Sequence, residues 1–309
     1  MPVNLLDLPG LTVSGFKALG MNHVTMNTPQ TSMHEIKPGQ SLELLKELHI
    51  LTRDGKMNQD SRRKLKQIYH LAQFIEPLLE EIRREHADIQ LVDHGAGKSY
   101  LGFILYDLFF KALGDGSRIY GVETRDELVA KSRDLALRLG FTGMRFLHQS
   151  VAESIASDDL PPRIDLVTAL HACDTATDDA IRFALEKRVK FIVLIPCCQA
   201  EVAAVLRKNK SKMLVSREHR VLAELWRHPL HTREFGSHLT NVLRCLQLEA
   251  HGYQVNFTEL VGWEHSMKNE LIIARYQDLP RKRPADRLLE LLGMLGLEEM
   301  RQRFFTPPE

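Results

Sequence analysis

Five short apolar runs, most of them followed by a helical stretch, constrain the fold of this chain more than any other feature. Strands that alternate with helices predict right-handed βαβ units and a parallel sheet. The expected strands cover Ile89–Asp93, Arg118–Glu123, Met144–His148, Ile164–Leu170 and Phe191–Ile195. The fifth run is apolar on both faces, which is typical of a strand buried between two helix layers. We therefore expect an α/β fold with a Rossmann-like, doubly wound sheet.

Two more strands are expected near the C-terminus, over Tyr253–Leu260 and Glu270–Tyr276. A short connection joins them, which predicts a C-terminal β-hairpin and a seven-stranded, mostly parallel sheet. The pattern along the chain predicts four regions. They are an extended arm over 1–40, an N-terminal helical segment over 41–86, the sheet domain over 87–278, and a C-terminal helical tail over 279–309 with an amphipathic helix pair at Pro284–Phe305.

Composition excludes several classes of protein. Hydrophobic residues make up 44% of the 309 residues, which is ample for a core and excludes disorder as the main state. The formal charge of +1 means that any surface for nucleic acid must be local. No apolar run approaches the ~20 residues of a membrane span, and residues 1–31 lack the pattern of a secretory signal. With only four cysteines, we expect free thiols and a cytoplasmic protein without membrane contact.

The turn after the first strand, Asp93–Ser99, is the expected ligand site, because ligands collect at the carboxyl ends of parallel strands. Two nucleotide motifs fit it poorly. A P-loop needs a glycine five residues before Gly97, where the chain has Val92. A dinucleotide fingerprint that starts at Gly95 needs a third glycine where Tyr100 stands.

A nucleoside without a pyrophosphate fits this turn better. Asp93 precedes the Gly-x-Gly turn, and Glu123 ends the next strand. A carboxylate offers paired acceptors to the two hydroxyls of a ribose, and acidic groups suit a ligand with a cationic or zwitterionic tail. S-adenosylmethionine is such a ligand.

The stretch Val92–Leu101 resembles the first motif of class I S-adenosylmethionine-dependent methyltransferases. More narrowly, the chain resembles the branch that holds a tRNA 2′-O-methyltransferase family and the glutathione S-transferase C-terminal-domain-containing proteins, in which this turn commonly reads Gly-Ala-Gly-Lys. Leu170–Asp178 and Ile195–Gln199 match the same branch, so the resemblance covers roughly Ile89–Tyr276. It implies a methyltransferase with S-adenosylmethionine as its cofactor.

The resemblance also assigns roles to individual residues. It implies that Asp93, Gly95 and Gly97 shape the pocket for the methionine part of the cofactor. Glu123 would hold the ribose, and Ser150 would lie near the adenine, where many relatives have an acid. His171 and Asp174 would face the transferable methyl group as the catalytic residues. The alternative for this last pair is a strand-end turn in which Asp174 caps a helix that begins at Thr175.

Three interpretations are open for Cys173, Cys197 and Cys198, which follow neighbouring strands. They could bind zinc, although two adjacent cysteines are awkward for tetrahedral geometry, and we expect no metal site. One could be the nucleophile of a pyrimidine methyltransferase. They could also be small buried residues that line the pocket.

Two basic clusters indicate what kind of molecule accepts the methyl group. Arg62–Lys66 precedes the sheet, and Arg207–Arg220 follows the fifth strand. Each could be an ordinary solvated face, but phosphate contacts of this kind also position nucleic acid. RNA is therefore the expected partner and acceptor, with a small-molecule or protein acceptor as the alternative. A non-catalytic module that binds S-adenosylmethionine is the rival from another class.

Overall fold

The structure is a computed structural model that describes residues 35–114, 116–170, 175–196, 199–213, 217–260, 270–279 and 281–307. It divides the chain into two units, Met1–Ile36 and Lys37–Glu309, and the fold below is that of the second unit. The predicted arm over 1–40 lies almost wholly outside the described residues. The predicted boundaries at 86 and 278 have no counterpart in this division and stay predictions.

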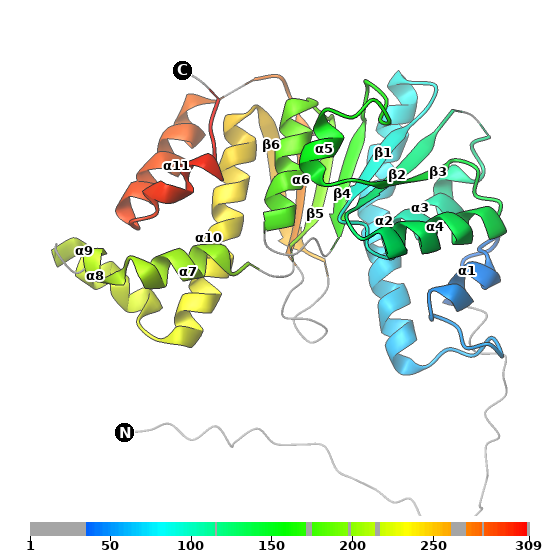
Figure 1. Cartoon of the computed structure of the whole chain (residues 1–309), viewed down its shortest axis with the longest axis horizontal. Coiled ribbons are helices and arrows are strands. Elements are labelled where there is room, and N and C mark those ends of the chain that lie inside the picture. Colours follow the sequence, from blue (N-terminus) through cyan, green and yellow to red (C-terminus); the bar gives the residue numbers. More distant parts are fainter. Residues whose placement is uncertain are drawn as a thin grey trace, which may run out of the picture. The chain divides into compact units, whose positions relative to one another are not determined.

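A seven-stranded sheet in the order β3-β2-β1-β4-β5-β7-β6 forms the centre of this unit (Figure 1). The strands are β1 (Gln90–His94), β2 (Arg118–Glu123), β3 (Met144–His148), β4 (Leu166–Leu170), β5 (Phe191–Ile195), β6 (Tyr253–Glu259) and β7 (Glu270–Tyr276). Strands β1 to β5 pair in parallel, whereas β7 pairs antiparallel with both β5 and β6. The expected doubly wound sheet and its C-terminal hairpin are confirmed.

Burial explains why these runs become strands. All five residues of β1 and all five of β5 are buried, as expected for parallel strands covered on both faces. One apolar core lies between the sheet and α6 (Thr175–Glu186), where Phe183 packs with Val92, Val167 and Ile192. The sheet thereby holds the carboxyl ends of β1, β4 and β5 next to one another.

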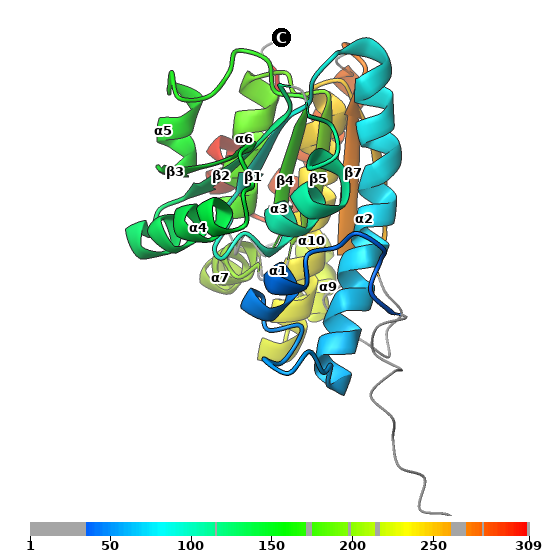
Figure 2. The same ribbon diagram turned by 90° about the vertical axis from the view of Figure 1, so that its right-hand side faces the viewer.

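Helices cover both faces of the sheet. Figure 2 shows α2 and α3 on one side and α5 and α6 on the opposite side. The helices are α1 (Leu42–Glu47), α2 (Gln59–Glu85), α3 (Tyr100–Leu105), the π-helix η3 (Tyr106–Phe110), α4 (Asp126–Arg138), α5 (Val151–Ile155), α6 (Thr175–Glu186), α7 (Glu201–Lys208), α8 (Lys210–Met213), α9 (Arg217–Leu222), the 3-10 helix η4 (Ala223–Trp226), α10 (Pro229–Ala250), α11 (Lys282–Met294) and the 3-10 helix η5 (Glu298–Gln302).

The expected N-terminal helical segment is present and docks on the sheet domain. Ser41 caps α1 by accepting a hydrogen bond from the backbone N–H of Leu44 at 3.1 Å. The backbone N–H of Ser41 in turn donates to Asp107 at 2.8 Å, which ties this segment to the helix that follows the glycine turn.

The helix that follows the glycine turn changes type along its length. It is an α-helix to Leu105 and a π-helix over Tyr106–Phe110. The side chains of the π-helical residues are engaged in tertiary contacts, since Tyr106 accepts a hydrogen bond from the backbone N–H of Gly143 at 2.9 Å. Tertiary packing therefore accompanies a change of helix type that periodicity does not signal.

A second apolar core joins α7, α10, α11 and η5. Trp226, Leu243, Leu292 and Phe304 are all fully or almost fully buried there. The predicted amphipathic helix pair at 284–305 is confirmed only for its first member, α11. The second member is the short 3-10 helix η5. Among the helices that the structure describes, none is long and apolar enough to cross a membrane.

Candidate functional site

The glycine turn leaves the sheet where the strand order reverses. The chain moves from β1 outward to β2 and β3 and then returns to β4 on the other side of β1. Such a switch point leaves a crevice at the carboxyl ends of the two central strands. Asp93 lies near the end of β1, in register with Thr168 of β4.

Asp93 is a buried carboxyl group at this point, with 2% of its surface exposed. Thr168 donates a hydrogen bond from Oγ1 to its Oδ1 at 2.8 Å, and the Ser99 hydroxyl lies 3.5 Å from its Oδ2. Desolvation raises the pKa of Asp93 to about 7, although both hydroxyls favour the ionised form. The protonation of this group is therefore balanced near neutral pH.

The turn backbone takes conformations that favour glycine. The φ angles of Gly95 and Gly97 are 61° and 57°, in the left-handed region. Ser99 also has a positive φ of 50°, and its backbone N–H donates to the carbonyl of Ala96 at 2.6 Å. The result is a tight turn without side chains at its two glycines, so that a ligand can approach the backbone closely.

Glu123 closes the turn from β2. Its Oε2 accepts a hydrogen bond from the backbone N–H of Gly97 at 2.8 Å. Desolvation raises the pKa of Glu123, but the hydrogen bonds from Arg125 and Gly97 outweigh it and lower the pKa to about 2. The carboxylate at the expected ribose position therefore stays ionised throughout the physiological range.

Arg125 is the partner that sequence reasoning missed. Its Nε donates to Glu123 Oε1 at 2.9 Å, its Nη2 donates to Oε2 at 3.2 Å, and its backbone N–H donates to Oε1 at 3.0 Å. With the Gly97 N–H, these donors match the roughly four lone-pair sites of a carboxylate. The signal in the sequence was the position of Arg125, two residues after the acidic residue that ends a strand.

Ser150 has a structural role in the described chain. It is the N-cap of α5. Its hydroxyl accepts from the backbone N–H of Glu153 at 3.2 Å, and its backbone N–H donates to the Glu153 carboxylate at 2.6 Å. This reciprocal capping box is enough to explain why a serine stands at position 150. Its expected place near the adenine stays a prediction.

The expected catalytic residues lie outside the described residues. His171 and Asp174 fall between the end of β4 at Leu170 and the start of α6 at Thr175. Cys173, Cys197 and Cys198 are also outside, so their three interpretations stay open. Within the described parts of the chain, no group of three or more metal-binding side chains occurs. The described cysteine, Cys245, is mostly buried, and burial raises its pKa to about 12.

His94, which sequence analysis did not single out, is fully buried beside the turn. Its ring meets the edge of Phe183 with the centroids 4.4 Å apart, and neither ring nitrogen has a hydrogen-bond partner in the described structure. Desolvation lowers the pKa of His94 to about 3, so the ring is neutral. Its neutral ring fills space between β1 and α6.

The two basic clusters differ in how far their charges are already paired. Lys64 and Lys66 are exposed on α2, and Arg63 lies 3.7 Å from Asp60. In the second cluster Lys208 pairs with Glu299 at 3.1 Å, and Lys210 donates to the backbone carbonyl of Arg227 at 3.1 Å. The side chains at 212–219 are outside the description, so Arg207–Arg220 is only partly visible.

The described residues fit a nucleoside with a positively charged tail. Glu123 is an ionised acceptor at the end of β2, and the glycines leave room for close approach to the backbone. A cationic group beside Asp93 would favour the ionised form of that carboxyl group, whose pKa is about 7 in the protein alone. The fold and site thus define a doubly wound α/β domain suited to a nucleoside ligand.

Comparisons with known proteins show what this domain resembles. Residues 63–205 match the family model described as a methyltransferase domain. The glutathione S-transferase C-terminal domain-containing proteins of Bos taurus and Mus musculus are each 22% identical over 239 residues, which is 72% of this chain and 35% of each relative. The chain therefore spans about a third of the length of these curated relatives.

Among solved structures, the magnesium protoporphyrin IX methyltransferase of Synechocystis PCC 6803 with bound SAH is similar with a TM-score of 0.41. It is 13% identical, and the match covers 76% of this chain and 93% of that one. Residues 63–205 thus match a methyltransferase domain, in agreement with the resemblance of the sequence motifs. The match and the motifs both indicate S-adenosylmethionine as the cofactor.

Proposed function

We propose that this protein transfers a methyl group from S-adenosylmethionine to RNA. The observation that carries the cofactor part is the closed turn at the switch point. There the Gly97 N–H and the Glu123 carboxylate lie 2.8 Å apart, next to the buried Asp93. The match of residues 63–205 to a methyltransferase domain agrees with it.

The two carboxyl groups at the site have distinct tasks in this proposal. Glu123 accepts hydrogen bonds from the ribose hydroxyls, and Asp93 offers negative charge toward the methionine part. S-adenosylmethionine supplies a methyl group that is already strongly electrophilic. The protein therefore mainly aligns the acceptor, and His171 or Asp174 removes its proton if the acceptor is a hydroxyl or an amine.

The RNA part of the proposal depends on the two basic clusters. Lys64 and Lys66 place two exposed cations one half-turn apart on α2, and Arg207 is exposed at the end of α7. Cations in the first turns of a helix oppose its dipole, so helix stability does not explain Lys64 and Lys66, whereas an external anion would. A chain of RNA phosphates is the corresponding ligand.

RNA affinity as a function of salt concentration tests this part. We expect Lys64→Glu/Lys66→Glu and Arg207→Glu/Lys208→Glu to weaken the binding of tRNA and rRNA fragments. Each lost phosphate contact should reduce the slope of log affinity against log salt by about 0.7 to 0.9. The matched control is Lys282→Glu/Arg283→Glu, which makes the same change in charge at exposed positions of α11 outside both clusters.

Equal slopes for the cluster variants and the wild-type protein would rule out RNA contact at these clusters. Weak binding of every RNA at low salt would favour a small-molecule or protein acceptor. Cofactor binding, measured on the same variants, should not change, because neither cluster includes a residue of the glycine turn.

A further inference from the structure

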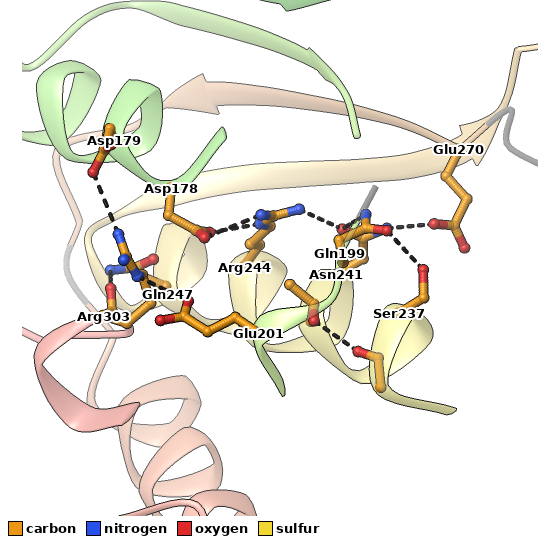
Figure 3. Close-up of polar contacts among 12 residues, drawn as sticks. Asp178, Asp179, Gln199, Glu201, Ser237, Asn241, Arg244, Gln247, Glu270 and Arg303 are labelled. Carbon is orange, nitrogen blue, oxygen red and sulfur yellow. Dashed lines mark hydrogen bonds and ion pairs between the residues drawn. The ribbon is translucent and has the colours of Figure 1, made fainter. Parts of the chain in front are cut away.

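A row of polar side chains on α10 connects three separate segments beside the carboxyl ends of the strands (Figure 3). Ser237, Asn241 and Arg244 follow one another at four- and three-residue steps, so they lie on one face of the helix. Most of this row is buried: Asn241 is 1% exposed and Arg244 is fully buried. The row is therefore part of the interior.

The first connection joins α10 to the start of α6. The Arg244 guanidinium donates from Nε to Asp178 Oδ1 at 2.6 Å and from Nη2 to Oδ2 at 3.1 Å. Asp178 lies in the first turn of α6, directly after the segment that follows β4. This two-pronged ion pair fixes both the distance and the orientation of the first turn of α6.

The second connection joins α10 to the segment that follows β5. Asn241 Oδ1 accepts hydrogen bonds from Arg244 Nη1 and from Gln199 Nε2, each at 3.1 Å. The Ser237 hydroxyl donates to Gln199 Oε1 at 2.6 Å. Both ends of the Gln199 amide are thus held by α10, four residues after the end of β5.

The third connection reaches the hairpin. Asn241 donates from Nδ2 to the carboxylate of Glu270, the first residue of β7. Because β7 runs antiparallel to β5, its first residues lie at the same edge of the sheet as the end of β5. One helix face therefore holds three segments that border the edge where the methyl group is transferred in the proposed function.

Stability alone does not explain this network. Replacing a buried ion pair by well-packed apolar side chains is often neutral or stabilising, because desolvation of two charges is costly. A connected set of directional hydrogen bonds instead permits one arrangement of its members and disfavours others. Such a network is expected where relative position matters more than net stability.

We propose that Asn241 and Arg244, with Ser237, are positioning residues for methyl transfer. They hold Asp178, Gln199 and Glu270 in one arrangement, so that the segments carrying the acceptor-side residues meet the cofactor in a fixed geometry. This inference rests on the proposed function for its kinetic consequence. Its structural part concerns only the α10 contacts.

The test uses the full-length protein and graded variants. Asn241→Ala removes the central amide, Ser237→Ala removes only the hydroxyl that holds Gln199, and Arg244→Lys keeps the charge but loses the two-pronged geometry. The matched control is Arg303→Met. Arg303 also bridges α6 and α7, through Asp179 and Glu201 at 3.3 Å each, but it contacts neither Gln199 nor Glu270.

We expect Asn241→Ala to lower kcat by about 10- to 100-fold, the scale of a small misplacement of reacting groups, with unchanged affinity for the cofactor. Ser237→Ala should have a smaller effect that disappears in a Gln199→Ala background, because it acts through Gln199. Arg244→Lys should retain more activity than Arg244→Met. Arg303→Met should leave kcat at the wild-type value.

A second measurement is independent of turnover. The rates at which iodoacetamide alkylates Cys197 and Cys198, read by mass spectrometry, should rise in Asn241→Ala and Ser237→Ala and stay unchanged in Arg303→Met. If wild-type protein methylates no acceptor but these rates rise, the proposed function fails while the positioning contacts stand. Wild-type kcat in Asn241→Ala with unchanged alkylation would overturn the inference, as would an Arg303→Met effect equal to that of Asn241→Ala.

Discussion

Arg125 donates two side-chain hydrogen bonds to the carboxylate of Glu123, from Nε to Oε1 at 2.9 Å and from Nη2 to Oε2 at 3.2 Å. The backbone N–H groups of Arg125 and Gly97 and the Thr124 hydroxyl, at 3.4 Å, also donate to this carboxylate. Ribose hydroxyls that bind Glu123 must therefore compete with the Arg125 side chain. Because 61% of that side chain is exposed, it can move into solvent.

Because of this competition, removing the side chain of Arg125 and removing that of Glu123 should change the affinity for the cofactor in opposite directions. Arg125→Met should tighten the binding of S-adenosylmethionine by up to about fivefold, the limit set by an exposed ion pair of up to about 1 kcal/mol. Lys131→Met, which removes a nearby cation of α4 that does not contact Glu123, is the control. Isothermal titration calorimetry with S-adenosylmethionine measures the affinity of both variants. Weaker binding in Arg125→Met would mean that Arg125 itself contacts the cofactor.

Gly97→Ala should abolish cofactor binding, because its φ of 57° disfavours a side chain and the added methyl group lies at the turn. The strain should also reduce the free energy of unfolding by about 1–2 kcal/mol. Gly140→Ala is a matched control, since its φ is 68° and nothing lies within 4 Å of the added methyl group. It should lose similar stability but bind the cofactor normally. Normal binding in Gly97→Ala would exclude close approach at this turn.

Asp93 should make the stability of the protein depend on pH. Its folded-state pKa of about 7 is above the ordinary value of 3.8, so the folded state binds a proton that the unfolded state has lost. This contribution is fully present below about pH 4 and is lost as the pH rises through 7, with a total on the order of 4 kcal/mol. Urea unfolding between pH 5 and 8 should show this slope in wild-type protein and lack it in Asp93→Asn. Parallel curves for the two proteins would contradict the raised pKa.

The two adjacent cysteines offer a test of the chemistry. If they line the pocket, Cys197→Ser and Cys198→Ser should each keep most of the methyl-transfer activity. A loss of several orders of magnitude, together with a covalent adduct on RNA that contains a fluorinated pyrimidine, would instead identify a nucleophile. Intact-mass measurement separates the two results.

The sheet could be predicted closely from the sequence because its signals are local. Phe191–Ile195 and Glu270–Tyr276 have the expected bounds, and β4 begins two residues later than its apolar run. Burial on both faces leaves a continuous apolar run that periodicity detects. The glycine turn could also be predicted from the sequence, because a positive φ favours glycine and both Gly95 and Gly97 have one.

The contacts between distant segments could not be predicted from the sequence. Arg244 and Asp178 are 66 residues apart, and nothing near either residue indicates its partner. The second core depends on tertiary packing in the same way, since Trp226 and Phe304 share one buried cluster only once α7, α10 and α11 pack together. Such pairings form only in the tertiary structure, and no local sequence pattern indicates them.

Calorimetric titration with S-adenosylhomocysteine, the demethylated form of the cofactor, tests the central claim most directly. We predict a single site in wild-type protein that S-adenosylmethionine competes for. Glu123→Ala should weaken this binding by about 1–3 kcal/mol, the scale of a lost charged hydrogen-bond partner. No binding to the wild-type protein, or equal affinity in Glu123→Ala, would contradict a cofactor site at the glycine turn after β1.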